Sequence, residues 1–210
     1  MKRPKSAGVE IAYLDKGKGP TVILGHCSCT FHKEWLPPIE ELQLNWRALA
    51  PDFTGYGQSE TWPGDRIFSG NADLSVSLEL AKKTKRPVHL VNEAPRPSRL
   101  GHSYGAAMAL AAARELGPKV QSLGLVEPVA FNLLRVEQCP EWSEVERLGA
   151  AVLTAVANGD DRAAAAAFMR YWLGRFRWWL SPASLKAVIT ATMPKVALEF
   201  TIAIDAPTIA

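Results

Sequence analysis

One five-residue stretch, Gly101-His102-Ser103-Tyr104-Gly105, has residue types and spacing that could present a nucleophile. It has the form G-x-S-x-G, which is typical of a sharp turn that lifts a serine hydroxyl between a strand and a helix. Glycines two positions on either side of Ser103 remove the Cβ atoms that would collide in such a turn. Ser103 would attack a carbonyl carbon and form an acyl-enzyme. Because a short pattern of this kind also occurs by chance, the surrounding elements must support the interpretation.

A helix is predicted directly after this turn. Residues 106–114 (AAMALAAAR) are strong helix formers, so a helix begins where a nucleophile turn needs one. Leu116-Gly117-Pro118 then ends it, because glycine is favoured just past a helix and proline cannot continue one.

On both sides of the turn, strand patterns alternate with helix patterns. Residues 35–44 indicate a helix with Trp35, Ile39 and Leu42 on one face, and residues 74–83 indicate another. Short apolar or alternating runs predict strands at 9–14, 21–24, 46–50, 87–91 and 120–126. This alternation predicts an α/β fold, a doubly wound and mostly parallel sheet with helices on both faces.

After Pro128 the chain has little strand signal and much helix signal. Val145, Leu148, Val152 and Val156 fall on one helical face, and Asp160 is placed to cap a helix over 161–172, with another predicted at 183–192. We therefore expect a core over residues 1–131 and a helical lid over 132–210.

Composition excludes several classes of protein. The net charge of +3 is small and scattered, which argues against a nucleic-acid partner, and no apolar run is long enough to cross a membrane. The N-terminus lacks the apolar core of a signal peptide, and the cysteine count of three is odd, so we expect a cytoplasmic protein. No Cys/His spacing matches a zinc site and no residue cluster implies a cofactor, so we expect no metal and no organic cofactor.

Three sequence motifs, which follow one another along the chain, carry a resemblance to a known family. The strand at 21–24 ends in Gly25-His26-Cys27-Ser28, residues 52–59 (DFTGYGQS) fit the pattern D-x-x-G-x-G-x-S, and the serine turn follows at 101–105. Together they resemble the α/β-hydrolase fold family over about the first 130 residues. The resemblance implies a serine hydrolase, similar to esterases, that acts on a small ester or a related carbonyl substrate.

The resemblance also implies roles for other residues. The backbone N–H groups of Tyr104 and Ser28 would form the oxyanion hole. Cys27 stands where the family has glycine, and its side chain is expected to crowd this loop. The simplest interpretation of Cys27 and Cys29 is that they are small buried or half-buried residues. The loop that holds Gly55 and Gly57 is expected to brace the site without contacting substrate.

Histidine is the main departure from the family pattern. The family orders its triad as serine, acid, histidine, but His26, His32, His89 and His102 all precede Ser103. By the resemblance His26 is structural, and His102 would point away from the site. His89 is expected in the core, which leaves His32 as a loose candidate for a surrogate base. Glu127 stands where some members have their acid, or it only marks the end of the sheet.

Two further features bear on activity. The chain ends after the lid, so the resemblance implies that it is C-terminally truncated and lacks the last strands of the sheet. An exposed sheet edge would then favour self-association. The segment 92–100 (NEAPRPSRL), which contains two prolines, separates the strand at 87–91 from the serine turn and is not expected to continue it.

Two functions therefore remain open. One is a serine hydrolase with impaired turnover, in which lid aromatics would form an apolar wall above Ser103. The other is a non-catalytic binding protein or a decayed gene product, in which the same aromatics only pack the lid helices. The aromatics in question are Tyr171, Trp172, Phe176, Trp178 and Trp179.

Overall fold

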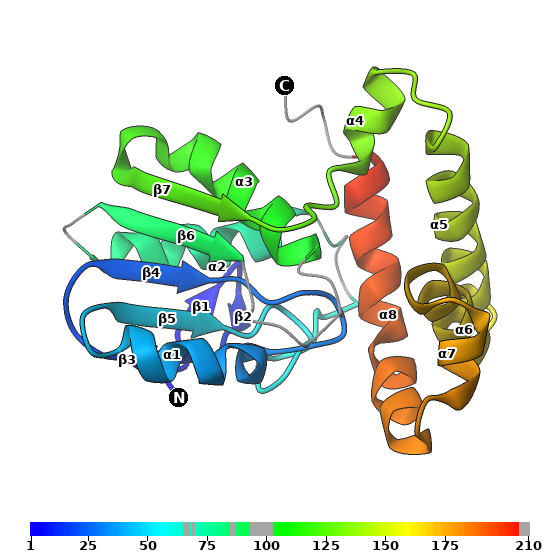
Figure 1. Ribbon diagram of the computed structural model, residues 1–210, viewed down its shortest axis with the longest axis horizontal. Helices are drawn as coiled ribbons and strands as arrows, with labels where there is room; N and C mark the ends of the chain where they lie inside the picture. Colours follow the sequence, from blue (N-terminus) through cyan, green and yellow to red (C-terminus); the bar gives the residue numbers. More distant parts are fainter. Residues whose placement is uncertain (65–67, 69, 85–86, 93–102, 206–210) are drawn as a thin grey trace. The chain divides into compact units, whose positions relative to one another are not determined.

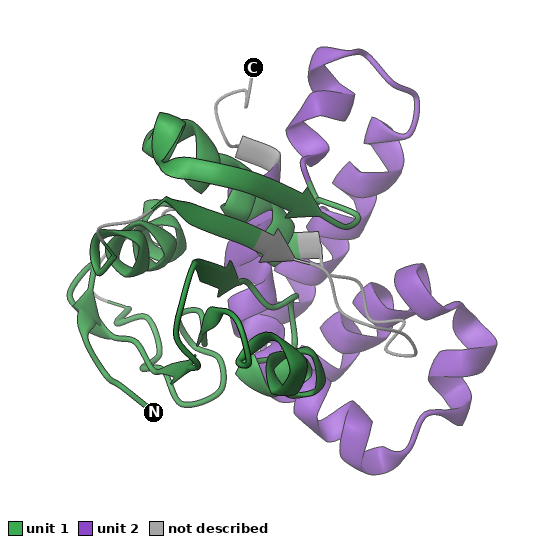
Figure 2. Ribbon diagram, turned by 60° about the vertical axis from the view of Figure 1, so that its left-hand side comes forward, with its two compact units in different colours: residues 1–129 green, residues 130–210 purple. Residues whose placement is uncertain are grey.

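The computed structural model of the chain describes residues 1–64, 68, 70–84, 87–92 and 103–205. The chain forms two compact units, residues 1–129 (unit 1) and residues 130–210 (unit 2), shown in different colours in Figure 2.

Unit 1 is built on a five-stranded sheet with the order β3-β5-β4-β6-β7 (Figure 1). The central and last strands are parallel, and only β3 runs antiparallel to its neighbour β5. The strands are β3 (Tyr13–Lys16), β4 (Thr21–Leu24), β5 (Arg47–Pro51), β6 (Val88–Asn92) and β7 (Val120–Leu125). The predicted mostly parallel α/β sheet is therefore confirmed.

The single strand predicted over 9–14 is wrong, because the chain changes partners in its middle. β2 (Val9–Glu10) pairs with β1 (Lys5–Ser6) in a two-stranded sheet, and β3 starts only at Tyr13. Between them the Ile11 N–H donates to the Pro4 carbonyl, and the Ala12 N–H donates to the Ser59 hydroxyl. The alternation of apolar residues is the same in both halves, so the sequence pattern does not reveal the break.

Helices cover both faces of the sheet (Figure 1). A short 3-10 helix (His32–Trp35) leads into α1 (Leu36–Leu42), and the two contribute Trp35 and Ile39 to a buried cluster with β4 and β5 side chains. Leu42 packs against the same cluster, so the predicted apolar face of this helix is confirmed. The opposite face carries α2 (Gly70–Lys82) and α3 (Ser103–Leu116).

The predicted end of α3 is also confirmed. The helix stops at Leu116, Gly117 has a φ of +51°, and Pro118 lies in a 3-10 turn (Gly117–Lys119) that leads into β7. A positive φ at this position suits glycine, which has no Cβ to collide with the preceding carbonyl.

Among the described strands, β7 forms one edge of the sheet, and it is lightly covered. Gln121 and Ser122 are exposed, and the Leu123 side chain is 37% exposed. An exposed edge strand offers unpaired backbone groups to another strand. Self-association through such an edge stays a prediction.

The described part of unit 2 is entirely helical. It comprises α4 (Phe131–Val136), α5 (Trp142–Ala157), α6 (Asp161–Leu173), α7 (Arg175–Leu180) and α8 (Ala183–Asp205). On α5 the predicted face is confirmed, with Val145, Leu148 and Val152 buried. The Asp160 carboxylate accepts a 2.9 Å hydrogen bond from the Ala163 N–H, so the predicted cap of α6 is confirmed too.

The last helix is longer than the sequence predicts. We expected it to end at Thr192, but α8 continues through Pro194 to Asp205. Proline removes one backbone hydrogen bond from a helix interior, which normally kinks or ends the helix. Here Ile189, Met193, Val196 and Phe200 are buried at helical spacing, and α8 packs against α5 and α6. Tertiary packing outweighs the local cost of the proline.

In the part of the chain that the structure describes, no helix combines the length and the apolar character needed to span a bilayer.

An ion pair between β3 and β5 makes stability depend on pH. The Arg47 guanidinium donates two hydrogen bonds, of 2.9 and 2.8 Å, to the Asp15 carboxylate, and chiefly these lower the pKa of Asp15 from 3.8 to about 2. A carboxyl whose pKa is lower in the folded state stabilises the fold above its unfolded pKa, and this contribution is lost as the pH falls from 3.8 towards 2. Solvent screening limits the contribution to about 1 kcal/mol.

We expect Asp15→Asn to lower the free energy of unfolding by about 1 kcal/mol at pH 7, with the difference from the parent chain disappearing near pH 2. Urea unfolding across this pH range measures it. Glu79→Gln, which removes an exposed carboxylate paired with Lys82, is the control and should cost less than about 0.5 kcal/mol. A deficit for Asp15→Asn that persists unchanged at pH 2 would contradict the assignment.

Candidate active site

The candidate site lies at the carboxyl edge of the sheet in unit 1. Because β4, β5 and β6 are parallel, the loops that follow them leave from the same edge. Ser103 is the first residue of α3, the helix that follows β6 in the chain. Gly101 and His102 lie outside the described residues, and for Ser103 the structure describes the backbone alone.

The loop after β4 comes very close to the first turn of α3. A Cβ placed on Gly25 would lie 3.3 Å from the Gly105 carbonyl oxygen and 3.4 Å from the Phe53 ring. Three segments, the loop after β4, the loop after β5 and the start of α3, therefore meet at Gly25. The structure thus brings the loop that holds the predicted oxyanion residue Ser28 next to the first turn of α3 in unit 1.

Tyr104, the residue after Ser103, is anchored by its side chain. It is buried, and its hydroxyl donates a 2.7 Å hydrogen bond to one Asp73 oxygen. The other Asp73 oxygen accepts a 2.9 Å hydrogen bond from the Thr54 N–H in the loop after β5. Asp73 therefore ties the first turn of α3 to that loop.

Sequence reasoning missed Asp73, although a signal was present. Asp73 shares the buried face of α2 with Val76, Ser77 and Leu80, at helical spacing. A carboxylate on an otherwise buried face is rarely tolerated unless it has partners, so its position alone indicated a structural or functional role.

Both ring nitrogens of His26 form hydrogen bonds that hold loops together. Its Nε2 accepts a 2.8 Å hydrogen bond from the Phe53 N–H, so the proton must lie on Nδ1, which donates to the Cys27 carbonyl at 2.7 Å. The ring is buried against Phe53 and Tyr56. The structural role predicted for His26 is confirmed, and neither ring nitrogen is left to take a proton from a nucleophile.

His32 is bound to a carboxylate. The His32 N–H and its Nδ1 both contact one Asp52 oxygen, at 2.7 and 2.8 Å, and the other Asp52 oxygen accepts a 2.9 Å hydrogen bond from the Gln58 N–H. Both partners are buried. Gly57, with a φ of +56°, lies so close that a Cβ there would be 2.3 Å from the Asp52 carboxylate. Asp52 therefore clamps the loop after β4 to the glycine loop after β5.

The predicted oxyanion loop forms a tight turn. The Thr30 N–H approaches the Cys27 carbonyl at 3.4 Å, and Cys29 has a φ of +65°. Ser28 lies half-buried within this turn. The geometry gives Ser28 a place on the same loop as Gly25, which contacts the first turn of α3.

The Cys27 side chain packs inside the turn, and the expected crowding of the loop stays a prediction. Its buried thiol lies against Thr30 and Glu34, and the Glu34 carboxylate also accepts a hydrogen bond from the Cys27 N–H at 3.3 Å. Burial, helped by the charge of Glu34, raises the pKa of the Cys27 thiol well above its usual value, so the thiol stays neutral and unreactive. No sequence pattern indicated a role for Glu34, because that role depends on how the turn after β4 folds back onto it.

Two other predicted residues lie apart from these contacts. His89 is on β6 but is only half-buried, so the prediction of a core residue is wrong; its Nδ1 is 2.7 Å from the Ser122 hydroxyl and its ring lies against Trp46. Glu127 is exposed after the end of β7, in a turn where its φ is +47°. Asn92 ends β6, while the rest of the 92–100 segment lies outside the described residues.

Within the described residues, no three His, Cys, Asp or Glu side chains are grouped so as to hold a metal ion.

Comparison with known proteins identifies the architecture. Residues 20–184 match the family model described as the alpha/beta hydrolase fold. A haloalkane dehalogenase from Agrobacterium fabrum is 28% identical over 135 residues, which are 64% of this chain and 41% of that protein. The chain therefore matches less than half the length of this relative.

Solved structures show the same fold. An alpha/beta hydrolase from Sphaerobacter thermophilus has a TM-score of 0.65 at 19% identity, covering 94% of this chain and 72% of its own. The enol-lactonase from Burkholderia xenovorans has a TM-score of 0.65 at 19% identity, and the match covers 98% of this chain and 74% of the lactonase. The epoxide hydrolase from Bacillus megaterium has a TM-score of 0.66 at 15% identity, and the match covers 95% of this chain and 70% of the epoxide hydrolase.

The anchor of Tyr104 can be tested by stability. We expect Tyr104→Phe to lower the free energy of unfolding by about 1–2 kcal/mol, because it removes a buried hydrogen bond to a carboxylate. Asp73→Ala should cost more, because it also leaves the buried Thr54 N–H unpaired. Chemical unfolding measures both. Tyr171→Phe, on an exposed tyrosine of unit 2, is the control and should change stability by less than about 0.5 kcal/mol. Equal stability of Tyr104→Phe and the parent chain would refute the anchor.

Proposed function

Since this chain belongs to the α/β-hydrolase fold family, we propose that it is a serine hydrolase that acts on a small ester or a related carbonyl substrate, with Ser103 as the nucleophile. The observation that carries the proposal is the position of Ser103. It begins a 14-residue helix, next to a tyrosine anchored by Asp73 and a glycine packed against Gly25. The start of a helix also favours the negative charge that develops on a carbonyl oxygen under attack.

In this proposal the oxyanion is bound by the backbone N–H groups of Tyr104 and Ser28. The Tyr104 N–H belongs to the first turn of α3, at the positive end of the helix dipole. Anchoring of the Tyr104 side chain fixes the direction of this group before substrate binds, which is the condition for effective charge stabilisation. One such donor contributes about 3 kcal/mol to a transition state.

The proposed hydrolase is a slow one. Serine needs a base, and no histidine follows Ser103 in the sequence. Among the described histidines, His32 alone contacts a carboxylate. Asp52, however, accepts hydrogen bonds from the backbone of two loops as well as from the His32 ring, and this favours a clamp over a base.

A non-catalytic protein of the same fold is the second candidate. The observation in its favour is that His26 and the Asp52–His32 pair are both engaged in holding loops together. A site whose described histidines hold loops together retains a shaped surface, and this role is different from moving protons.

Covalent labelling separates the two candidates. We expect intact-mass spectrometry after exposure to a fluorophosphonate to show a single adduct that forms slowly and is absent in Ser103→Ala. Slow labelling follows from a presented but poorly activated hydroxyl. A folded chain that gains no adduct would reject the hydrolase and leave the binding protein.

The role of His32 follows from the same assay. We expect His32→Gln to lower the melting temperature but to change the labelling rate by less than about threefold, because the ring clamps a loop. His89→Gln is the control for the loss of a half-buried imidazole. A fall of about a hundredfold or more in the labelling rate, with the fold retained, would instead identify His32 as the base.

A further inference from the structure

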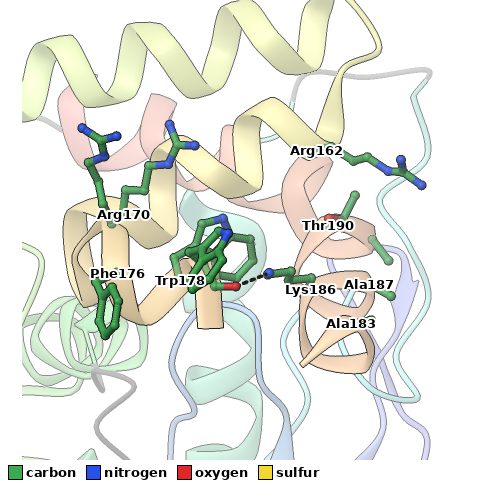
Figure 3. A pocket seen from close by; sticks show the side chains of 11 residues that line it. Arg162, Arg170, Phe176, Trp178, Ala183, Lys186, Ala187 and Thr190 are labelled. Atoms are coloured by element: carbon green, nitrogen blue, oxygen red, sulfur yellow. Dashed lines mark hydrogen bonds between the residues drawn. The ribbon is translucent and has the colours of Figure 1, made fainter. Parts of the chain in front are cut away.

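Unit 2 contains a pocket of its own. It has a volume of about 930 Å³, and its described lining residues belong to α6, α7 and α8 (Figure 3). Pockets that bind small organic molecules have volumes of roughly 300–1,000 Å³. The pocket is therefore large enough for a small organic ligand, and its described lining lies within one unit.

Among the residues that the structure describes, the charged side chains on the pocket wall are all positive. They are Arg162, Arg170, Arg175 and Lys186. In the part of the chain that the structure describes, none of the three arginine side chains has a hydrogen-bond or ion-pair partner. The sequence from Arg162 to Leu198 contains no acidic residue at all. These cations are thus left uncompensated around a concavity, which concentrates positive potential there.

The other part of the wall is aromatic. Phe176 and Trp179 are 70% and 71% exposed, although large aromatic side chains are ordinarily covered, and their ring centroids lie 6.2 Å apart. Trp178 is buried beside them. Exposed aromatic rings next to cations offer both a flat apolar surface and a charge partner to a ligand.

Lys186 gives this wall a fixed shape. Its Nζ donates a 2.8 Å hydrogen bond to the Trp179 carbonyl and lies 5.6 Å from the centre of the Trp178 ring. Figure 3 draws the hydrogen bond of Lys186 as a dashed line. The ammonium group thereby joins α8 to the end of α7. A ligand would meet a wall that is already ordered, which reduces the entropy lost on binding.

We propose that this pocket binds an organic anion that combines a flat apolar body with a carboxylate or a similar head group. The apolar body stacks on Phe176 and Trp179, and the head group pairs with Arg170 and Arg175. Guanidinium groups suit this task because their planar forks bind carboxylates with two hydrogen bonds. Such a site is separate from the chemistry of Ser103, because it needs neither a nucleophile nor a base.

A membrane surface is the alternative partner for exposed tryptophans and arginines. The concave form of the site favours a small ligand, because a bilayer is met by a protruding apolar face and not by a hollow. Arg177 distinguishes the two, since it is exposed on α7 but does not line the pocket. A membrane would use Arg177 as much as Arg175, whereas a ligand within the pocket would not.

The test is calorimetric titration of the full chain with naphthalene-2-carboxylate, and with naphthalene-2-methanol as its neutral counterpart. We expect the carboxylate to bind about tenfold more tightly than the alcohol, and Arg170→Gln and Arg175→Gln each to weaken it about three- to tenfold. Arg177→Gln is the matched control and should change its affinity less than about twofold. Circular dichroism shows that each variant is folded.

Several results would overturn the site. These are no binding of the carboxylate, equal binding of the alcohol, or equal losses in Arg175→Gln and Arg177→Gln. Binding to phosphatidylglycerol vesicles that both of these variants weaken alike would assign the patch to a membrane instead. Titration of Ser103→Ala should give the parent affinity, so failure of this site and failure of the proposed hydrolase can be told apart.

Discussion

Buried polar side chains, and not strand pairing, hold the loops at the carboxyl edge of the sheet, and the candidate site depends on this constraint. His26 joins the loop after β4 to the loop after β5, Asp52 joins the same two loops through His32, and Asp73 joins the second loop to Tyr104. A buried polar group that loses its partner costs about 1–3 kcal/mol. The hydrogen bonds of His26, Asp52 and Asp73 all form together in one arrangement of the loops. The same hydrogen bonds that stabilise unit 1 therefore also fix the geometry around Ser103.

Two glycines let these bonds form. Any side chain at Gly57 would collide with the Asp52 carboxylate, and any at Gly25 would press on the first turn of α3. The positive φ of Gly57 adds a second reason for glycine there, because residues with a Cβ rarely adopt it. The glycine loop after β5 therefore acts by making room for a buried carboxylate that binds its backbone. This is a physical reason for the bracing role that the sequence predicted for that loop.

The sequence predicted well what depends on local pattern. The sheet, the end of α3 and the cap at Asp160 all follow from runs of apolar residues and from glycine, proline and aspartate at known positions. It failed where a distant partner decides the outcome. α8 continues through Pro194 because buried side chains hold it, and the strand over 9–14 breaks because Ile11 bonds to Pro4. Asp73 bonds to segments that are far away in the sequence, and Glu34 bonds to Cys27 only because the turn folds back. A short stretch of sequence does not reveal either contact.

Presenting a nucleophile and activating it require different groups, and in the proposed hydrolase the described contacts of unit 1 fit the first of these tasks. Presentation needs a helix start, a close glycine and fixed N–H groups, which depend on packing and hydrogen bonds formed on folding. Activation needs a ring nitrogen with a free lone pair that can exchange a proton. His26 has both nitrogens bonded within the loops, and His32 shares its carboxylate with two backbone N–H groups. For this reason we assign His26 to the scaffold of the site.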